Sequence, residues 1–218
     1  MIILTDLSEV LIRGLYGTED IIEWRYGREA GERFWQRHLE AATNTTWCDA
    51  MRGKCSEDDY WQKICEDDEL GLSAAELKDA FSENLSRKVP GTLDVYQRIV
   101  GAPRSLKPGA EITYGRTDIR IVSDHVRERL AELQKLHPAV FTLATRCYWS
   151  FETGLLKGDS GFFARLLKES NLAPDEVVFV DDMQCNVDAA KEAGIKTIQF
   201  MNAEQLEQEL DGLGFRFF

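Results

Sequence analysis

Carboxylate, hydroxyl and ammonium side chains stand directly after short apolar runs, or in a loop between them, at four places: Asp6, Ser123 with Asp124, Lys157, and Asp181 with Asp182. The apolar runs are typical of buried strands, and the carboxyl ends of parallel strands meet at one sheet edge, where ligands bind. Carboxylates gathered there repel each other, and a divalent cation that prefers oxygen ligands, such as Mg²⁺, offsets that repulsion. An adjacent lysine and serine hydroxyl would hold a phosphate, so the set suits phosphoryl transfer to an aspartate.

The elements that position these side chains alternate along the chain. Apolar runs typical of strands occupy residues 2–4, 119–122, 148–150, 177–180 and 197–200. Helical periodicity lies between them, at residues 93–100, 126–136, 162–170 and 187–193. Such alternation predicts an α/β fold with a three-layer α/β/α, Rossmann-like core around a parallel sheet. Residues 101–117, rich in Gly, Pro and charge, are predicted to be a loop.

Residues 14–92 have a different texture, with aromatic and charged residues at helical spacing. We predict a small all-helical domain there, so the α/β core is discontinuous and comprises residues 1–13 and 93–218. Two helix starts carry the pattern of a capping box, Ser56 with Asp59 and Ser73 with Glu76. Aromatic side chains at helical spacing more often form a core than a substrate site, and we expect this of most of the following: Trp24, Tyr26, Phe34, Trp35 and Trp61.

The composition limits the class of protein. At 218 residues, with 44% hydrophobic and 29% charged residues, the chain is typical of a folded globular protein. Its net charge of −12 argues against binding to nucleic acid or to an anionic membrane, because phosphate groups favour clustered Lys and Arg. No signal-peptide pattern opens the sequence, and five cysteines without a CxxC pair suit a reducing compartment, so we expect a cytoplasmic protein. The three histidines lie far apart, so no zinc site is expected.

Four segments resemble, in the same order, the motifs of the haloacid dehalogenase (HAD) superfamily: residues 6–11, 122–124, 154–157 and 177–186. The last has the DDxxxN form and is the most specific of the four. The resemblance covers nearly the whole core. It also implies that residues 14–92 are a helical cap, because one class of this superfamily inserts such a cap after the first strand.

The resemblance implies a magnesium site. Asp6 would be both the nucleophile and a magnesium ligand, and Asp182 would be the second carboxylate on the metal. Asp181 would orient a metal-bound water, and the main-chain carbonyl of Ser8 would be a further ligand. Asn186 would support this arrangement from outside the metal's own ligands.

The resemblance also implies a phosphate site. Ser123 would hydrogen-bond a phosphate oxygen, and Lys157 would offset the charge between Asp6 and the phosphate. Asp124 departs from the family pattern, in which many members have Asn, and a carboxylate beside a phosphate would be repulsive. We therefore expect Asp124 to turn away and cap the helix that starts at Val126.

Ser8 is the main departure. Phosphatases of this superfamily usually carry at this position an aspartate that protonates the leaving group and later activates water. General acid–base assistance is worth roughly 10²–10⁴-fold in rate, so the sequence predicts a slow phosphatase unless Glu9, Asp124 or His125 substitutes.

Three functions follow from these residues. The leading hypothesis is a Mg²⁺-dependent phosphatase of a small phosphorylated metabolite, with a sugar phosphate as the first substrate and an aspartyl-phosphate as the intermediate. The second is a catalytically impaired domain that binds a phosphorylated ligand or a protein partner. The third is a metal-independent haloacid dehalogenase, against which the adjacent Asp181 and Asp182 count, because two carboxylates there call for a metal.

Overall fold

The computed structural model describes residues 1–66, 68–101 and 117–217, so the predicted loop at residues 101–117 falls almost entirely outside the described residues. Five parallel strands form one sheet: β1 (Ile2–Thr5), β2 (Asp118–Ser123), β3 (Arg146–Trp149), β4 (Val177–Asp181) and β5 (Lys196–Gln199). Their order is β3-β2-β1-β4-β5, so the direction of winding reverses beside β1. Ligands of open α/β sheets bind at such a reversal, beyond the carboxyl ends of the strands.

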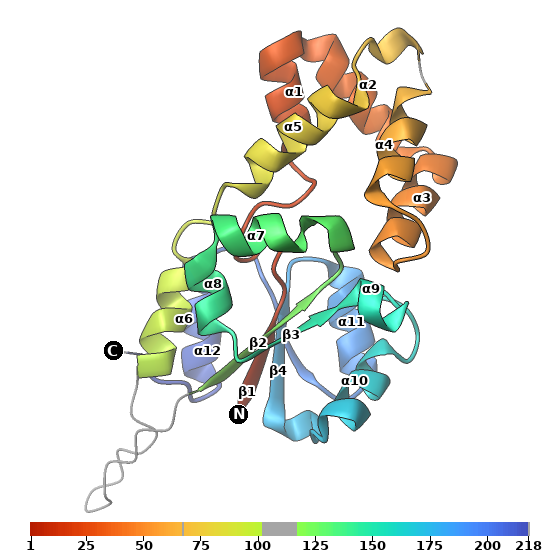
Figure 1. Cartoon of the computed structure of the whole chain (residues 1–218). Coiled ribbons are helices and arrows are strands. Elements are labelled where there is room, and N and C mark those ends of the chain that lie inside the picture. The colour runs from red at the N-terminus through yellow and green to blue at the C-terminus, as the bar shows by residue number, and fades with distance from the viewer. Residues whose placement is uncertain (67, 102–116, 218) are drawn as a thin grey trace, which may run out of the picture.

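Helices cover both faces of the sheet, which confirms the three-layer α/β/α prediction (Figure 1). One layer holds α6 (Thr92–Gly101), α7 (Leu130–Leu136), α8 (Pro138–Leu143) and α12 (Ala203–Gly212); the other holds α9 (Ser150–Thr153), α10 (Phe162–Ser170) and α11 (Gln184–Glu192). Successive strand residues face opposite layers. Ile3 therefore packs in the hydrophobic core that includes residues of α6, and Leu4 packs in the core that includes residues of α10. All five residues of β4 are buried, as a central parallel strand requires.

The helical module consists of α1 (Thr18–Tyr26), α2 (Arg28–Leu39), α3 (Ala41–Met51), α4 (Glu57–Cys65) and α5 (Ala74–Leu85). It lies beyond the carboxyl ends of the strands (Figure 1). Both expected capping boxes are present, at the starts of α4 and α5. Among the described residues, no helix has the length and apolar character needed to cross a bilayer.

Of the five aromatic residues for which a core position was the general expectation, Trp24 and Tyr26 are exposed. Phe34 and Trp61 are buried and stack on each other. Trp24 is 81% exposed, so the expectation that it belongs to the core is wrong. The reason is its place on α1: the helix buries Ile21 and Ile22, and a residue two positions after Ile22 points to the opposite side.

The module joins the core through two segments that lie side by side. Residues 7–14 lead from β1 into the module, and residues 86–91 lead back to α6. Arg13 N–H donates to the Arg87 carbonyl at 2.9 Å, and Val89 N–H donates to the Leu11 carbonyl at 3.0 Å. The outgoing and returning chains therefore brace each other at the sheet edge.

Candidate active site

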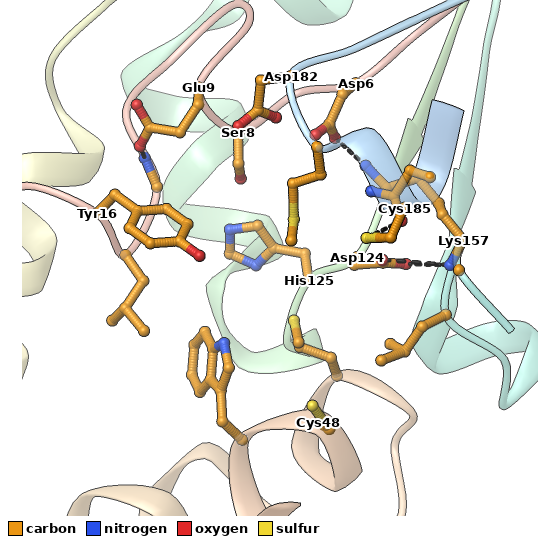
Figure 2. Close-up of a pocket in the computed structure, with 18 of the residues that line it drawn as sticks. Asp6, Ser8, Glu9, Tyr16, Cys48, Asp124, His125, Lys157, Asp182 and Cys185 are labelled. Carbon is orange, nitrogen blue, oxygen red and sulfur yellow. Dashed lines mark hydrogen bonds and ion pairs between the residues drawn. The ribbon is translucent and has the colours of Figure 1, made fainter. Parts of the chain in front are cut away.

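Three carboxylates meet at the reversal of the sheet. Oxygens of Asp6, Asp181 and Asp182 all lie within 4.8 Å of one another. The ammonium of Lys157 lies 2.7 Å from Asp6 Oδ1 and 2.7 Å from Asp181 Oδ2. The structure thus brings together four residues that the sequence singles out in three separate segments; Figure 2 shows three of them, Asp6, Lys157 and Asp182.

The register of the sheet explains this convergence. Thr5 of β1 pairs with Val180 of β4, so Asp6 and Asp181 follow on adjacent strands. Asp6 N–H donates to the Val180 carbonyl at 2.8 Å, and Asp6 Oδ1 accepts from Leu7 N–H at 2.7 Å. The site is therefore held by strand ends, which are more rigid than loops.

Asp181 is held in place by several hydrogen-bond donors. Its Oδ1 accepts from Met183 N–H at 2.9 Å and from Asn186 Nδ2 at 3.0 Å, and its Oδ2 contacts Lys157. Asn186 therefore holds Asp181 and, through it, Lys157. Asp182 is the carboxylate of this pair that lines the cavity.

Charge in the cluster is unbalanced. Burial raises the pKa of Asp6 well above its usual range, although Lys157 opposes the shift. Burial and the neighbouring Asp181 raise the pKa of Asp182 to about 6. Burial lowers the pKa of Lys157, but Asp181 and Asp6 outweigh it and hold the amine protonated. One ammonium among three carboxylates leaves excess negative charge, and this all-oxygen donor set fits Mg²⁺.

Ser123 ends β2 and is 1% exposed. Its Oγ has no hydrogen-bond partner among the described residues, which is unusual for a buried hydroxyl. It is not among the described residues that line the cavity. An unpartnered hydroxyl at this strand end is consistent with the phosphate contact that the sequence predicts.

Asp124 does not cap the helix after Val126, so that expectation is wrong. Its two carboxylate oxygens accept from the backbone N–H of Lys157 at 3.1 and 3.2 Å. The helical segment there starts as a 3-10 turn whose first position has no side-chain cap, and the buried carboxylate is satisfied by the Lys157 loop. Burial raises the pKa of Asp124 to about 6, and Lys157 opposes the rise.

The residues considered as substitutes for the missing acid–base aspartate have other partners. Glu9 has a left-handed backbone (φ 58°), and its carboxylate accepts from Gly14 N–H at 2.7 Å and from Arg13 at 2.8 Å. Asp124 is held by the Lys157 loop. His125 lines the cavity, and its Nδ1 accepts from Val126 N–H at 2.9 Å. Burial lowers the pKa of His125 to about 4, although the backbone of Val126 opposes the shift, so the ring is a poor base at neutral pH.

A cavity of about 300 Å³ separates the cluster from the helical module. Ser8 lines it beside Asp6 and Asp182. Across from them, α3 presents Cys48 (Figure 2). The helices therefore form the wall opposite the carboxylates.

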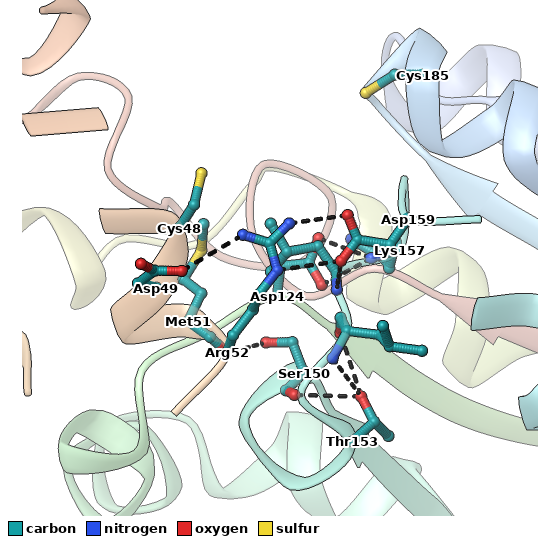
Figure 3. A network of polar contacts seen from close by, with 12 residues as sticks. Cys48, Asp49, Met51, Arg52, Asp124, Ser150, Thr153, Lys157, Asp159 and Cys185 are labelled. Carbon is teal, nitrogen blue, oxygen red and sulfur yellow. Dashed lines mark hydrogen bonds and ion pairs between the residues drawn. The ribbon is translucent and has the colours of Figure 1, made fainter. Parts of the chain in front are cut away.

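A link between the module and the Lys157 loop was not predicted from the sequence (Figure 3). Arg52, directly after α3, donates to both oxygens of Asp159, from Nε at 3.1 Å and from a terminal nitrogen at 2.8 Å. Asp159 Oδ2 also accepts from Leu156 N–H at 2.9 Å. No local pattern signals this pair, because its members are 107 residues apart.

No protein-family model matches the chain. A sesquiterpene phosphatase of Aspergillus oryzae is 27% identical over 150 residues, which are 69% of this chain and 69% of the relative. A D-ribitol-5-phosphate phosphatase of Bacteroides thetaiotaomicron is 35% identical over 65 residues, and a drimenol cyclase of Aspergillus calidoustus is 23% identical over 181 residues. These two matches cover 30% and 77% of this chain, and this chain spans only 32% and 30% of the two relatives.

Solved structures match over almost the full length. A HAD-like family hydrolase of Porphyromonas gingivalis has a TM-score of 0.68 at 20% identity, covering 97% of this chain and 96% of that one. A HAD family enzyme of Bacteroides thetaiotaomicron, in complex with magnesium and inorganic phosphate, has a TM-score of 0.62 at 16% identity, covering 92% and 93%. The L-2-haloacid dehalogenase of Xanthobacter autotrophicus has a TM-score of 0.61 at 18% identity, covering 97% and 83%. This protein has the fold of the haloacid dehalogenase superfamily.

Proposed function

We propose that this protein is a Mg²⁺-dependent phosphatase of a small phosphorylated metabolite and that Asp6 is its nucleophile. The observation that carries the proposal is the position of Lys157, whose ammonium bridges Asp6 and Asp181 inside the acidic cluster. Two curated relatives are phosphatases by name, one for a sesquiterpene and one for D-ribitol 5-phosphate. A structural neighbour was solved with magnesium and phosphate.

Asp6 attacks through one oxygen. Oδ1 already contacts Lys157 and Leu7 N–H, so Oδ2 is the oxygen that attacks phosphorus. The new Asp6–phosphorus bond forms as the bond to the substrate alcohol breaks, and the departing alkoxide takes a proton from water. Water then attacks the aspartyl-phosphate, releasing inorganic phosphate and restoring Asp6.

The neighbouring groups stabilise that transfer. Mg²⁺, held by Asp6, Asp182, the Ser8 carbonyl and, through water, Asp181, would neutralise charge on the phosphate. Lys157 stays protonated and offsets the charge of Asp6. The Ser123 hydroxyl donates to a phosphate oxygen.

Turnover is expected to be slow. Ser8 supplies no carboxyl group, and the carboxylates of Glu9 and Asp124 are committed to other donors. These engaged partners also favour a second candidate, an impaired domain that binds a phosphorylated ligand without hydrolysing it. Metal-independent dehalogenation is the weaker candidate, because the excess carboxylates would then have no cation.

We further propose that residues 14–92 act as a cap that excludes water from the site. The five cysteines are free thiols in the part of the chain that the structure describes, which suits the reducing cytoplasm expected from the sequence.

The decisive experiment measures phosphate release from a panel of monoesters with and without Mg²⁺. The panel includes sugar phosphates, the first substrates expected from the sequence, and terpenoid monophosphates. Mg²⁺-dependent release that Asp6→Asn abolishes supports the proposal, with the exposed Asp175→Asn as a matched control that keeps activity. Release that survives Asp6→Asn sinks the mechanism.

Two further outcomes identify the other candidates. No turnover by the wild type, with activity gained in Ser8→Asp, identifies the impaired binding domain. Halide release without metal identifies the dehalogenase.

A further inference from the structure

The cavity over the acidic cluster has two chemically different ends. Asp6, Asp182 and Lys157 form one end. The wall contributed by the helical module carries large apolar side chains, from the loop before α1, from α3 and from α5: Leu15, Trp47, Met51 and Phe81. The phosphate end therefore opens onto an apolar body site.

Outside the acidic cluster, every carboxylate among the described lining residues already has a partner: Glu9 accepts from Gly14 N–H, Asp124 from Lys157 N–H, and Asp159 from Arg52. Lys157 is the sole lysine or arginine among the described lining residues, and Asp6 and Asp181 already hold it. Arg52 donates hydrogen bonds to both carboxylate oxygens of Asp159, which also lines the cavity.

The neutral polar groups on the module side are also few. His38 Nδ1 lies 3.0 Å from the Tyr60 hydroxyl, and burial lowers the pKa of His38 to about 4, so the ring is uncharged at neutral pH. Asn44 and Tyr16 remain as neutral hydrogen-bonding groups on this side. One amide and one phenol offer only a few hydrogen bonds, and a polyol needs more partners than these two side chains supply.

The energetics favour an apolar body. A hydroxyl buried without a partner weakens binding by roughly tenfold, so a sugar with several hydroxyls would bind this wall poorly. Each methylene buried against it strengthens binding by about threefold to fourfold. The volume of about 300 Å³ has room for about ten water-sized groups, the phosphate included, so the substrate is a small one.

We infer that the substrate is the phosphate monoester of a largely apolar alcohol, whose body packs on Leu15, Trp47, Met51 and Phe81. This inference rests on the proposed phosphatase function and replaces the sugar phosphate expected from the sequence. The phosphate is positioned by the strand ends, and the helical module selects the alcohol.

A homologous series tests the inference. We expect kcat/KM with Mg²⁺ to rise about threefold to fourfold per added methylene through ethyl, butyl, octyl and decyl monophosphate until the cavity is full. The best alkyl ester should exceed ribose 5-phosphate and glucose 6-phosphate by at least about 100-fold. A sugar phosphate that matches the best alkyl ester overturns the inference while leaving the phosphatase proposal intact.

Binding decides the same question without turnover. Calorimetry with the corresponding alkylphosphonates, which cannot be hydrolysed, should give the same dependence of Kd on chain length in the Mg²⁺-loaded wild type. If no monoester is hydrolysed, the proposed function fails. The dependence of Kd on chain length still shows whether the site binds an apolar group. A Kd independent of chain length refutes the apolar site.

A matched pair of variants locates the selectivity. Met51→Gln places an amide in the wall and should lower the octyl-to-ethyl ratio of kcat/KM by at least about tenfold. Leu39→Gln is the control, because Leu39 is 60% exposed on α2 and is not among the described lining residues. Thermal melting of both variants verifies folding. An unchanged ratio in Met51→Gln, or an equal loss in Leu39→Gln, contradicts the assignment.

Discussion

Arg52 of the helical module donates hydrogen bonds to both carboxylate oxygens of Asp159, which lies two residues after Lys157. The ion pair is partly exposed, with 21% and 29% of the two side chains accessible. Because Asp159 also accepts from Leu156 N–H, it fixes the loop on the amino-terminal side of Lys157 as well. The pair therefore links the position of the module to that of the lysine.

Arg52→Ala should reduce kcat/KM by about tenfold and change the free energy of unfolding by no more than ~1 kcal/mol, because exposed ion pairs stabilise little. Steady-state kinetics and urea denaturation measure the two effects. Arg98→Ala is the control. Arg98 also donates to both oxygens of one carboxylate, that of Glu207, but this pair joins α6 to α12. Equal activity in both variants would show that the link to Asp159 has no role in catalysis.

The residues at the strand ends could be predicted from the sequence, whereas the residues of the cavity wall formed by the helical module could not. Each strand is a short apolar run, and parallel strands are recognised by composition and length alone. These runs are sufficient to place Asp6 and Asp181 at the same edge of the sheet. Helix α12 was not predicted, although Asn202 supplies a recognisable signal by capping Gln205 N–H.

The opposite wall depends on contacts between distant segments. Arg52 and Asp159, and the faces that Trp47 and Met51 present to the cavity, are set by how the module sits over the sheet. Helical periodicity gives Trp24 and Trp61 the same expectation of a core position, yet Trp24 is 81% exposed and Trp61 is fully buried. A single sequence holds no local signal for that choice.

A buried ion pair joins the module to the core and should dominate its stability. Arg129 Nε lies 2.8 and 2.9 Å from the two oxygens of Glu57, whose Oε1 also accepts from Trp61 Nε1 at 2.8 Å. Glu57→Gln removes the buried one of the two carboxylates that pair with Arg129 and leaves only the partly exposed Glu132, so it should cost about 3 kcal/mol. That corresponds to a Tm lower by roughly 6–12 °C.

The exposed pair of Arg165 and Glu169 provides the comparison, and Glu169→Gln should change stability by less than about 0.5 kcal/mol. Urea denaturation at neutral pH measures both variants. A loss below ~1 kcal/mol in Glu57→Gln would mean that water reaches Arg129.

Acid should weaken the fold through His38. Burial lowers the pKa of His38 from 6.5 to about 4, so the unfolded chain binds the proton more readily and stability falls as pH drops below about 6.5. Between pH 7 and pH 5 this amounts to about 2 kcal/mol. His38→Gln removes this titratable group. The difference in the free energy of unfolding between wild type and variant should therefore shrink by that amount as the pH falls from 7 to 5. A gap independent of pH would contradict a buried neutral imidazole.

Gly14 makes room for Ser8. A Cβ on Gly14 would lie 2.9 Å from Ser8 Cβ and 3.2 Å from its Oγ, and the backbone N–H of Gly14 anchors Glu9. Gly14→Ala must push Ser8 into the cavity beside Asp6 and Asp182, and overpacking of this kind costs about 1–3 kcal/mol. We expect kcat/KM for a monoester to fall by about tenfold, because the carbonyl proposed as a metal ligand moves with Ser8.

Gly212→Ala is the matched control for Gly14→Ala. An added Cβ meets nothing within 4 Å at Gly212, the last residue of α12, so alanine there should leave kcat/KM unchanged and raise stability by up to about 1 kcal/mol. The apparent Mg²⁺ affinity of each variant, from the metal dependence of kcat, separates the two proposed causes. A weaker affinity in Gly14→Ala alone places the Ser8 carbonyl on the metal, whereas full activity with unchanged metal dependence would remove Ser8 from the site.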